Sequence, residues 1–211
     1  DRLFMVKYPF HHFRVPPTTR TKKRAIPKDQ LLRIRELTYP VGSPIWHARN
    51  YALIMFYCRG MNFIDLVKLK MANIHSGRIQ YGRSKTGSPL SVKIFPDLYS
   101  VLTYYTKDKR EDEYLFPANY DGSLKHAEKY KTLCRRMNEH LATIARDAGI
   151  QEKLTTYTIR HTWATTAKYL GIPIEVISEA LGHKSLDTTE VYLKGFNDEI
   201  LDDANEKIFN S

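Results

Sequence analysis

The chain has 211 residues, enough for one medium-sized domain with a hydrophobic core, and it carries 33 Lys and Arg against 23 Asp and Glu. The formal charge of +10 favours a polyanionic partner such as nucleic acid. No apolar run reaches the roughly 20 residues that a membrane span requires, so we expect an intracellular, cytoplasmic protein without membrane contact.

The chain shows no framework for a disulfide or a metal. Its two cysteines, Cys58 and Cys134, lie far apart and form no CxxC pair, and Cys58 sits in an apolar run that predicts a core position. His11 and His12 are adjacent but lack further ligands nearby. We therefore expect no metal and no cofactor.

The first 24 residues differ in character from the rest. Pro9, Pro16 and Pro17 stand among basic and aromatic residues, a composition too broken for an independent fold. We interpret residues 1–24 as the tail of a missing amino-terminal domain plus a linker, and residues 25–211 as the main domain.

Three helices are predicted at the start of the main domain. One begins at Pro27 and ends before Pro40. The second, over about 45–59, is apolar on nearly all sides, which is typical of a central helix. A third, short helix is expected over 63–67.

The hydrophobic period changes to two between residues 73 and 95. Two strands with turns at Ser76-Gly77 and Thr86-Gly87 are predicted; their apolar residues are Ile79, Tyr81, Leu90, Val92 and Ile94. The fold class is therefore mainly α with a small antiparallel β-sheet (α+β). Strand parity would point Arg83 and Lys85 to the same side if the strand continued that far.

Helices over 96–107 and 123–148 follow, and then one that begins at Thr155 or Thr156 and ends at Gly171. An apolar stripe marks this last helix; its members are Ile159, Trp163, Ala167 and Leu170. Arg160 lies beside the stripe, so we expect it at the rim of the core.

The last two short helices carry further candidate residues. Pro173 suits the start of one helix, which ends at Gly182 just before His183. Ser185 can cap the next helix, which carries Tyr192. The closing segment, 198–211, has an amphipathic pattern formed by Ile200, Leu201, Ala204 and Ile208.

Arg160, His183 and Tyr192 thus lie in order at the edges of short helices, an arrangement that suggests phosphoryl transfer to a tyrosine. Each has a simpler explanation when taken alone. Tyr192 could be an aromatic core residue, His183 could cap helix carbonyls, and Lys85 could be a solvated turn residue. His161 is expected to be structural.

Three motifs together carry a family resemblance: LGHKSLDTTEVY, RHTWATTA and RSKTG. Over about residues 25–209 the chain resembles the catalytic domain of tyrosine recombinases, the phage-integrase family, and in particular integrases of Bacteroidetes mobile elements. The resemblance implies that Tyr192 is the nucleophile and that Arg160, His183 and Lys85 are catalytic. It also implies that the missing amino-terminal domain is a core-binding domain.

Two positions depart from the family pattern. Asn62 in MNFIDL stands where most members have an arginine, and Tyr157 stands where most have a histidine. Both can donate hydrogen bonds, but Asn62 brings no charge. We expect Arg83 to replace the missing cation, with Arg59 as the second candidate.

The implied activity is site-specific recombination of double-stranded DNA through a 3′-phosphotyrosine, without metal or ATP. The resemblance also implies a homotetramer on DNA and a nucleoid-associated place in a bacterium; a monomer remains an alternative for this fragment. Integrase, invertase and resolvase remain open, as do the target site and the host element.

Three other interpretations were weighed. A DNA-binding regulator with this fold could have lost cleavage when Asn62 and Tyr157 arose, although the other catalytic candidates remain. A type IB topoisomerase would use the same chemistry, but the short chain and the LGHKS motif fit integrases better. A metal nuclease is disfavoured because no clustered ligand set appears.

Overall fold

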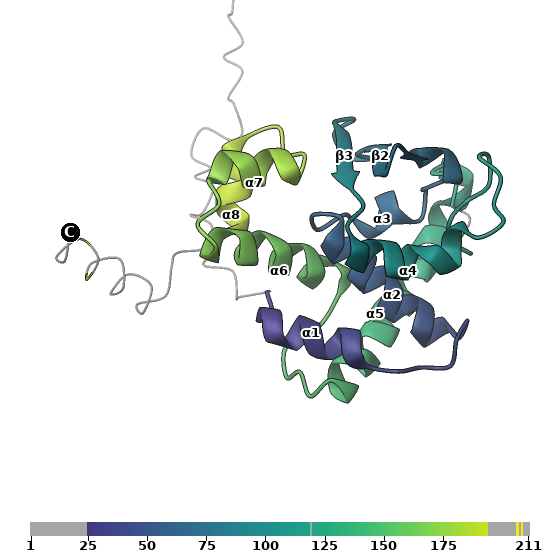
Figure 1. Ribbon diagram of the computed structural model, residues 1–211, viewed down its shortest axis with the longest axis horizontal. Coiled ribbons are helices and arrows are strands. Elements are labelled where there is room, and N and C mark those ends of the chain that lie inside the picture. Colours follow the sequence, from purple (N-terminus) through teal and green to yellow (C-terminus); the bar gives the residue numbers. More distant parts are fainter. Residues whose placement is uncertain (1–24, 119, 194–205, 207, 209–211) are drawn as a thin grey trace, which may run out of the picture.

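The computed structural model describes residues 25–118, 120–193, 206 and 208, without the side chains of 191 and 192. It is mainly helical, with one small antiparallel sheet, and this confirms the expected fold class (Figure 1). The predicted linker over 1–24 lies outside the described residues, as does nearly all of the amphipathic segment over 198–211.

The helices and 3₁₀ turns of the described chain are, in order, α1 (Lys28–Glu36), α2 (Pro44–Tyr57), α3 (Phe63–Leu66), η1 (Met71–Asn73), α4 (Pro96–Thr106), η2 (Leu124–His126), α5 (Ala127–Asp147), α6 (Thr156–Tyr169), α7 (Ile174–Ala180) and α8 (Leu186–Tyr192). The helix predicted over 123–148 is thus preceded by a 3₁₀ turn. None of the described helices is long and apolar enough to cross a membrane.

Helix α2 is the central helix that its apolar sequence predicted. Ser43 caps it, since its Oγ accepts a hydrogen bond from the Trp46 amide at 3.3 Å, and Pro44 follows at the first helical position. The helix ends two residues earlier than expected because Arg59 and Gly60 have φ values of 58° and 67°. Such left-handed residues end an α-helix.

The sheet has the order β1-β2-β3, with β1 (Ile74–His75), β2 (Arg78–Gly82) and β3 (Pro89–Lys93) all antiparallel. Ser76 and Gly77 both have positive φ, the geometry that suits a tight hairpin turn. Ile79 pairs with Val92, and both are buried. The sheet therefore covers one side of the main core.

The buried apolar residues form two separate clusters. The larger core is built around α2 and extends from α1 to Ile159 in the first half of α6. The smaller core joins the second half of α6 to α7 and the end of α8; its members are Ala164, Ala167, Ile177, Leu181 and Leu193. Leu170, predicted as part of the α6 stripe, is 69% exposed because the helix ends just before it.

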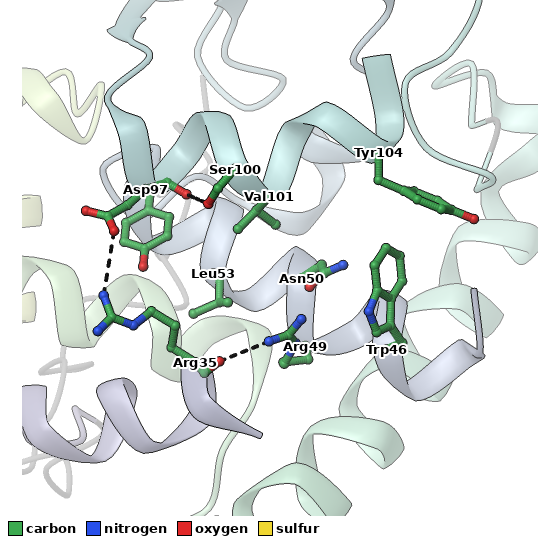
Figure 2. A pocket seen from close by; sticks show the side chains of 10 residues that line it. Arg35, Trp46, Arg49, Asn50, Leu53, Asp97, Ser100, Val101 and Tyr104 are labelled. Carbon is green, nitrogen blue, oxygen red and sulfur yellow. Dashed lines mark hydrogen bonds and ion pairs between the residues drawn. The ribbon is translucent and has the colours of Figure 1, made fainter. Parts of the chain in front are cut away.

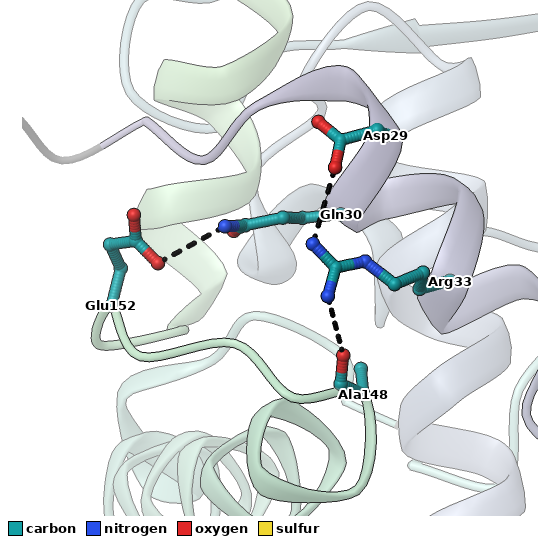
Figure 3. Close-up of polar contacts among 5 residues, drawn as sticks. All are labelled: Asp29, Gln30, Arg33, Ala148 and Glu152. Atoms are coloured by element: carbon teal, nitrogen blue, oxygen red, sulfur yellow. Dashed lines mark hydrogen bonds and ion pairs between the residues drawn. The ribbon is translucent and has the colours of Figure 1, made fainter.

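Polar contacts attach α1 to the loop between α5 and α6 (Figure 3). Arg33 forms an ion pair with Asp29 at 3.2 Å and donates a hydrogen bond to the Ala148 carbonyl at 3.2 Å. Gln30 donates to Glu152 at 3.3 Å. The start of the described chain is thus tied to the element that leads into α6.

Candidate active site

Arg160 lies deeper than its sequence position predicted. Thr155 is the cap of α6, because its Oγ1 accepts from the Thr158 amide at 3.1 Å. One turn later, Arg160 is 2% exposed, and its guanidinium donates to the Gly60 carbonyl at 2.8 Å and to the Leu181 carbonyl at 2.7 Å. One arginine therefore connects the end of α2 with the end of α7.

Gly60 makes this arrangement possible, and sequence reasoning missed it. A Cβ at this position would lie 3.1 Å from the Arg160 Cα and 3.2 Å from its Cγ. The positive φ of 67° also disfavours any side chain. The sequence signal that could have identified Gly60 is a glycine in a short turn after a buried helix.

Arg83 does not share an outward direction with Lys85, so this prediction was wrong. Strand β2 ends at Gly82, and Arg83 begins a tight turn in which its carbonyl accepts from the Gly87 amide at 2.8 Å. Its side chain is 5% exposed and donates to the Gly182 carbonyl. Arg83 and Arg160 thus bind two consecutive carbonyls, just before His183.

Lys85 is exposed in the same turn, which packs against the Gly182 carbonyl through the Thr86 hydroxyl at 3.3 Å. Asp65, which is 3% exposed, fixes the turn from the other side, since its Oδ1 accepts from the Ser84 amide at 2.8 Å. Asp65 was not identified from the sequence. Only the tertiary contact between α3 and this turn reveals its position.

His183 is half-buried beside both arginines. Its Nε2 lies 3.1 Å from Arg160 Nη2, and its Nδ1 lies 2.8 Å from the Thr189 hydroxyl. Burial is the largest cause that lowers the pKa of His183 to about 4, and the charges of Arg160, Arg83 and Lys85 lower it further. The imidazole is therefore neutral at physiological pH.

The residues that depart from the family pattern lie around this group. Asn62 precedes α3, and its amide nitrogen is 3.5 Å from an Asp65 carboxylate oxygen. Tyr157 is 40% exposed in the first turn of α6, and its ring meets the largely buried His161 ring edge-on at 4.4 Å. Arg59 lies two residues beyond the end of α2, after the cap residue Cys58, and has a φ of 58°. The catalytic roles of Asn62, Tyr157 and Arg59 therefore stay predictions.

Tyr192 is the last residue of α8, and its side chain lies outside what the structure describes. The helix itself begins where predicted, directly after Ser185. Thr189, which is fully buried in this helix, is another contact that the sequence did not reveal.

A pocket of about 230 Å³ lies elsewhere, between α1, α2 and α4 (Figure 2). Trp46 and Tyr104 line one part of it, and Arg49 lies beneath, donating to the carbonyls of Arg35 at 3.0 Å and Leu37 at 3.2 Å. None of the predicted catalytic residues lines this pocket. The candidate site is the group of side chains around Arg160, with no connection to this cavity.

Residues 24–198 match the model of the phage integrase family, and the chain belongs to this family. It is 31% identical over 147 residues to tyrosine recombinase XerA of Pyrococcus furiosus, an alignment that covers 67% of this chain and 48% of the relative. The predicted tyrosine recombinase catalytic domain is thereby confirmed. The closer resemblance to integrases of Bacteroidetes elements stays a prediction.

Solved structures show the same fold. The XerH recombinase bound to a palindromic difH substrate has a TM-score of 0.64 at 21% identity, covering 89% of this chain and 53% of that one. The integrase of the transposon Tn1549, in complex with a circular intermediate DNA, has a TM-score of 0.59 at 13% identity, with 92% and 68% covered. The chain spans about half the length of the curated relatives it matches.

Proposed function

We propose that this chain is the catalytic domain of a site-specific DNA recombinase that cleaves and rejoins DNA through a 3′-phosphotyrosine. The observation that carries the proposal is the convergence of Arg160, Arg83 and His183 on one turn, in a chain of the phage integrase family. A charge of +10 suits the DNA partner. We further propose that residues 1–24 are the tail of a core-binding domain and linker, which would act together with this catalytic domain.

In the proposed reaction the Tyr192 oxygen attacks a DNA phosphorus, and the bond to the 5′-oxygen breaks. Arg160 stabilises the charge that develops on the phosphate oxygens, as preorganised cationic donors do. Lys85 protonates the leaving 5′-oxygen. His183 either hydrogen-bonds a phosphate oxygen or moves a proton. The bond energy is retained in the phosphotyrosine, so no ATP is required.

Arg83 takes the place of the missing first arginine in this proposal. Its buried guanidinium donates to Gly182, the residue next to His183, whereas Asn62 offers only a neutral amide. A charge-assisted contact is about twice as strong as a neutral one. Tyr157 contributes a hydroxyl donor at the rim, and Arg59 remains the weaker candidate for the cation.

The first test concerns Tyr192. Incubation of the chain with nicked suicide DNA that carries the cognate core site, followed by a denaturing gel, detects the covalent adduct. Tyr192→Phe should abolish the adduct and leave DNA binding nearly unchanged, because only the hydroxyl is removed. An adduct of undiminished yield in this variant would show that another residue is the nucleophile.

The same experiment decides between this function and a DNA-binding regulator. A wild-type chain that binds the core site but forms no adduct, even when joined to its amino-terminal domain, would favour the regulator. The enzyme is favoured because the other catalytic candidates remain, namely Lys85, Arg160, His183 and Tyr192. Such an enzyme would work at the nucleoid of a bacterial cell.

We also propose assembly into a homotetramer on DNA through the closing segment, 198–211. Its apolar residues Ile200, Leu201 and Ala204 recur at helical spacing and need a surface to cover. Deleting residues 198–211 should impair assembly of two duplexes more than binding of one duplex, as measured by native gels and light scattering. Equal loss of both would indicate that the segment packs on its own domain.

A further inference from the structure

Thr189 contacts His183, and the proposed reaction assigns no role to this contact. Thr189 is fully buried in α8, and its hydroxyl lies 2.8 Å from His183 Nδ1. It precedes Tyr192 by three residues, which is less than one helical turn. The partner of His183 is therefore carried by the same helix as the proposed nucleophile.

The two ring nitrogens of His183 have different partners, and this fixes its tautomer. A guanidinium only donates hydrogen bonds, so Nε2, 3.1 Å from Arg160 Nη2, must be the acceptor nitrogen. In a neutral imidazole the other nitrogen then carries the proton and donates it to the Thr189 oxygen. The opposite tautomer would place an N–H against the N–H of Arg160.

This tautomer decides between the two roles left open for His183. A Nε2 without a proton cannot donate to a phosphate oxygen, but it can accept a proton. Tyr157 stands where most family members have a histidine, and a phenol is a poor proton acceptor near neutral pH. Among the catalytic candidates of this chain, His183 Nε2 is therefore better suited than Tyr157 to accept the proton of the nucleophile.

We propose that Thr189 is a positioning residue: its hydroxyl accepts from the Nδ1–H that the Arg160 contact imposes on His183, holds the ring in this orientation and thereby makes His183 Nε2 the general base for Tyr192. The inference rests on the proposed function. As the scissile phosphate binds, Arg160 turns its N–H toward the phosphate oxygens, and Nε2 receives the proton of the Tyr192 hydroxyl. The phenolic oxygen bonds to phosphorus, the bond to the 5′-oxygen breaks, and that oxygen takes a proton from Lys85.

The tautomer is tested directly by the two-bond ¹H–¹⁵N spectrum of the full chain labelled with [¹⁵N]histidine. We expect the Nδ1–H pattern for His183 in the wild type and in Thr189→Ser, which keeps the hydroxyl. Thr189→Val has nearly the same shape but no acceptor, so the Nδ1–H loses its partner and its signal should broaden through faster exchange with solvent, while Arg160 keeps the tautomer unchanged. A wild-type His183 with the Nε2–H pattern would overturn the proposal without any variant.

Single-turnover cleavage of nicked suicide DNA gives the second readout. Thr189→Val should slow adduct formation roughly 100-fold, the scale of one general base, with DNA affinity unchanged. The rate of adduct formation by Thr189→Ser should stay within about threefold of the wild-type rate. Serine keeps the hydroxyl but loses a methyl group, so a role in packing alone would predict a loss in this variant instead. An unchanged rate in Thr189→Val would overturn the proposal, as would an equal loss in both variants.

The outcomes for the two proposals are distinguishable. If the wild type forms no adduct, the recombinase function fails, while the histidine spectra still decide whether the Thr189 hydroxyl holds the Nδ1–H of His183. If the adduct forms and His183 has the Nε2–H pattern, the function stands and the role of Thr189 is wrong. If Thr189→Val does not fold, Thr189→Ser and the wild-type spectrum carry the test.

Discussion

The larger and smaller cores of this molecule hold the candidate site in different ways. The larger core packs helices from both halves of the chain around α2 and supports the turn with Arg83 and Lys85. The smaller core has few buried apolar residues, yet α7 and α8 flank His183 and carry Tyr192. Extensive apolar burial stabilises the first region, whereas the second, with fewer buried apolar residues, depends more on polar contacts with its neighbour.

The polar contacts between the two regions meet at one turn, directly before His183. Arg160 and Arg83 donate to the carbonyls of Leu181 and Gly182, and Arg160 also contacts His183. The same guanidinium groups are the proposed phosphate binders. Stability of the smaller region and catalysis therefore share two side chains, and the predictions below separate the two contributions.

The largest effect is expected for Arg83→Ala. It removes a buried cation that the proposed transition state needs, so cleavage should fall by roughly two to three orders of magnitude. Arg59→Ala is the control and should do less. DNA binding, measured by fluorescence anisotropy, should change little. Cleavage at the wild-type rate by Arg83→Ala, together with an inactive Arg59→Ala, would move the compensating charge to the end of α2.

A matched pair of core substitutions separates the two regions next. Ile54 and Ile177 are both fully buried, one in each core. Each change to Ala should destabilise its surroundings by roughly 2–5 kcal/mol. Ile54→Ala should lower the urea midpoint of the whole domain, whereas Ile177→Ala should mainly speed hydrogen exchange of the amides in 174–190.

Equal hydrogen exchange in both variants across the whole chain would contradict this difference. The larger and smaller cores would then unfold as one cooperative unit. In that case the polar contacts at Leu181 and Gly182 join the two regions more firmly than their small shared apolar surface suggests.

The smallest effect concerns pH. The pKa of His183 is lowered to about 4 by burial and neighbouring cations, while the unfolded state keeps the ordinary value near 6.5. Between these values the unfolded chain binds the proton more tightly, so stability falls as pH drops below about 6.5. The ring is half exposed, and we expect a loss of about 1 kcal/mol after discounting for solvent screening.

His183→Gln should remove this loss, as measured by urea unfolding at about pH 7 and about pH 4.5. The matched control is His47 in the larger region, whose pKa is also lowered by burial. His47→Gln should change the pH dependence of the urea midpoint of the whole domain. His183→Gln should change mainly the pH dependence of amide hydrogen exchange in residues 174–190. An unchanged pH dependence in His183→Gln would mean that the imidazole is solvated in solution.

Local sequence signals predicted most of the helices and the turns between them. The Thr155 cap, the Ser76-Gly77 turn and the glycine before His183 each act within a few residues, so their effects can be read from the chain. Arg160 and His183 were found because their motif is local as well. The fold class followed from the two hydrophobic periods.

The missed features all depend on contacts between distant segments. Gly60 meets Arg160 across 100 residues, and Asp65 meets Ser84 across 19. The strand rule failed for Arg83 because β2 ends at Gly82 and the turn redirects the side chain. No period or propensity encodes such contacts, since each requires the packed arrangement of α2, α6 and the hairpin.

The Gly182 carbonyl receives two donors, the Arg83 guanidinium and the Thr86 hydroxyl. A phosphate oxygen carries a negative charge and attracts a guanidinium more strongly than a neutral carbonyl does, so under the proposed function a phosphate that reaches Arg83 would draw it away from Gly182. Thermodynamic linkage makes the relation reciprocal: under the proposed function, bound DNA would loosen the turn before His183, and a looser turn would bind DNA more readily. Substrate affinity and the mobility of the nucleophile's helix are thus expected to rise together.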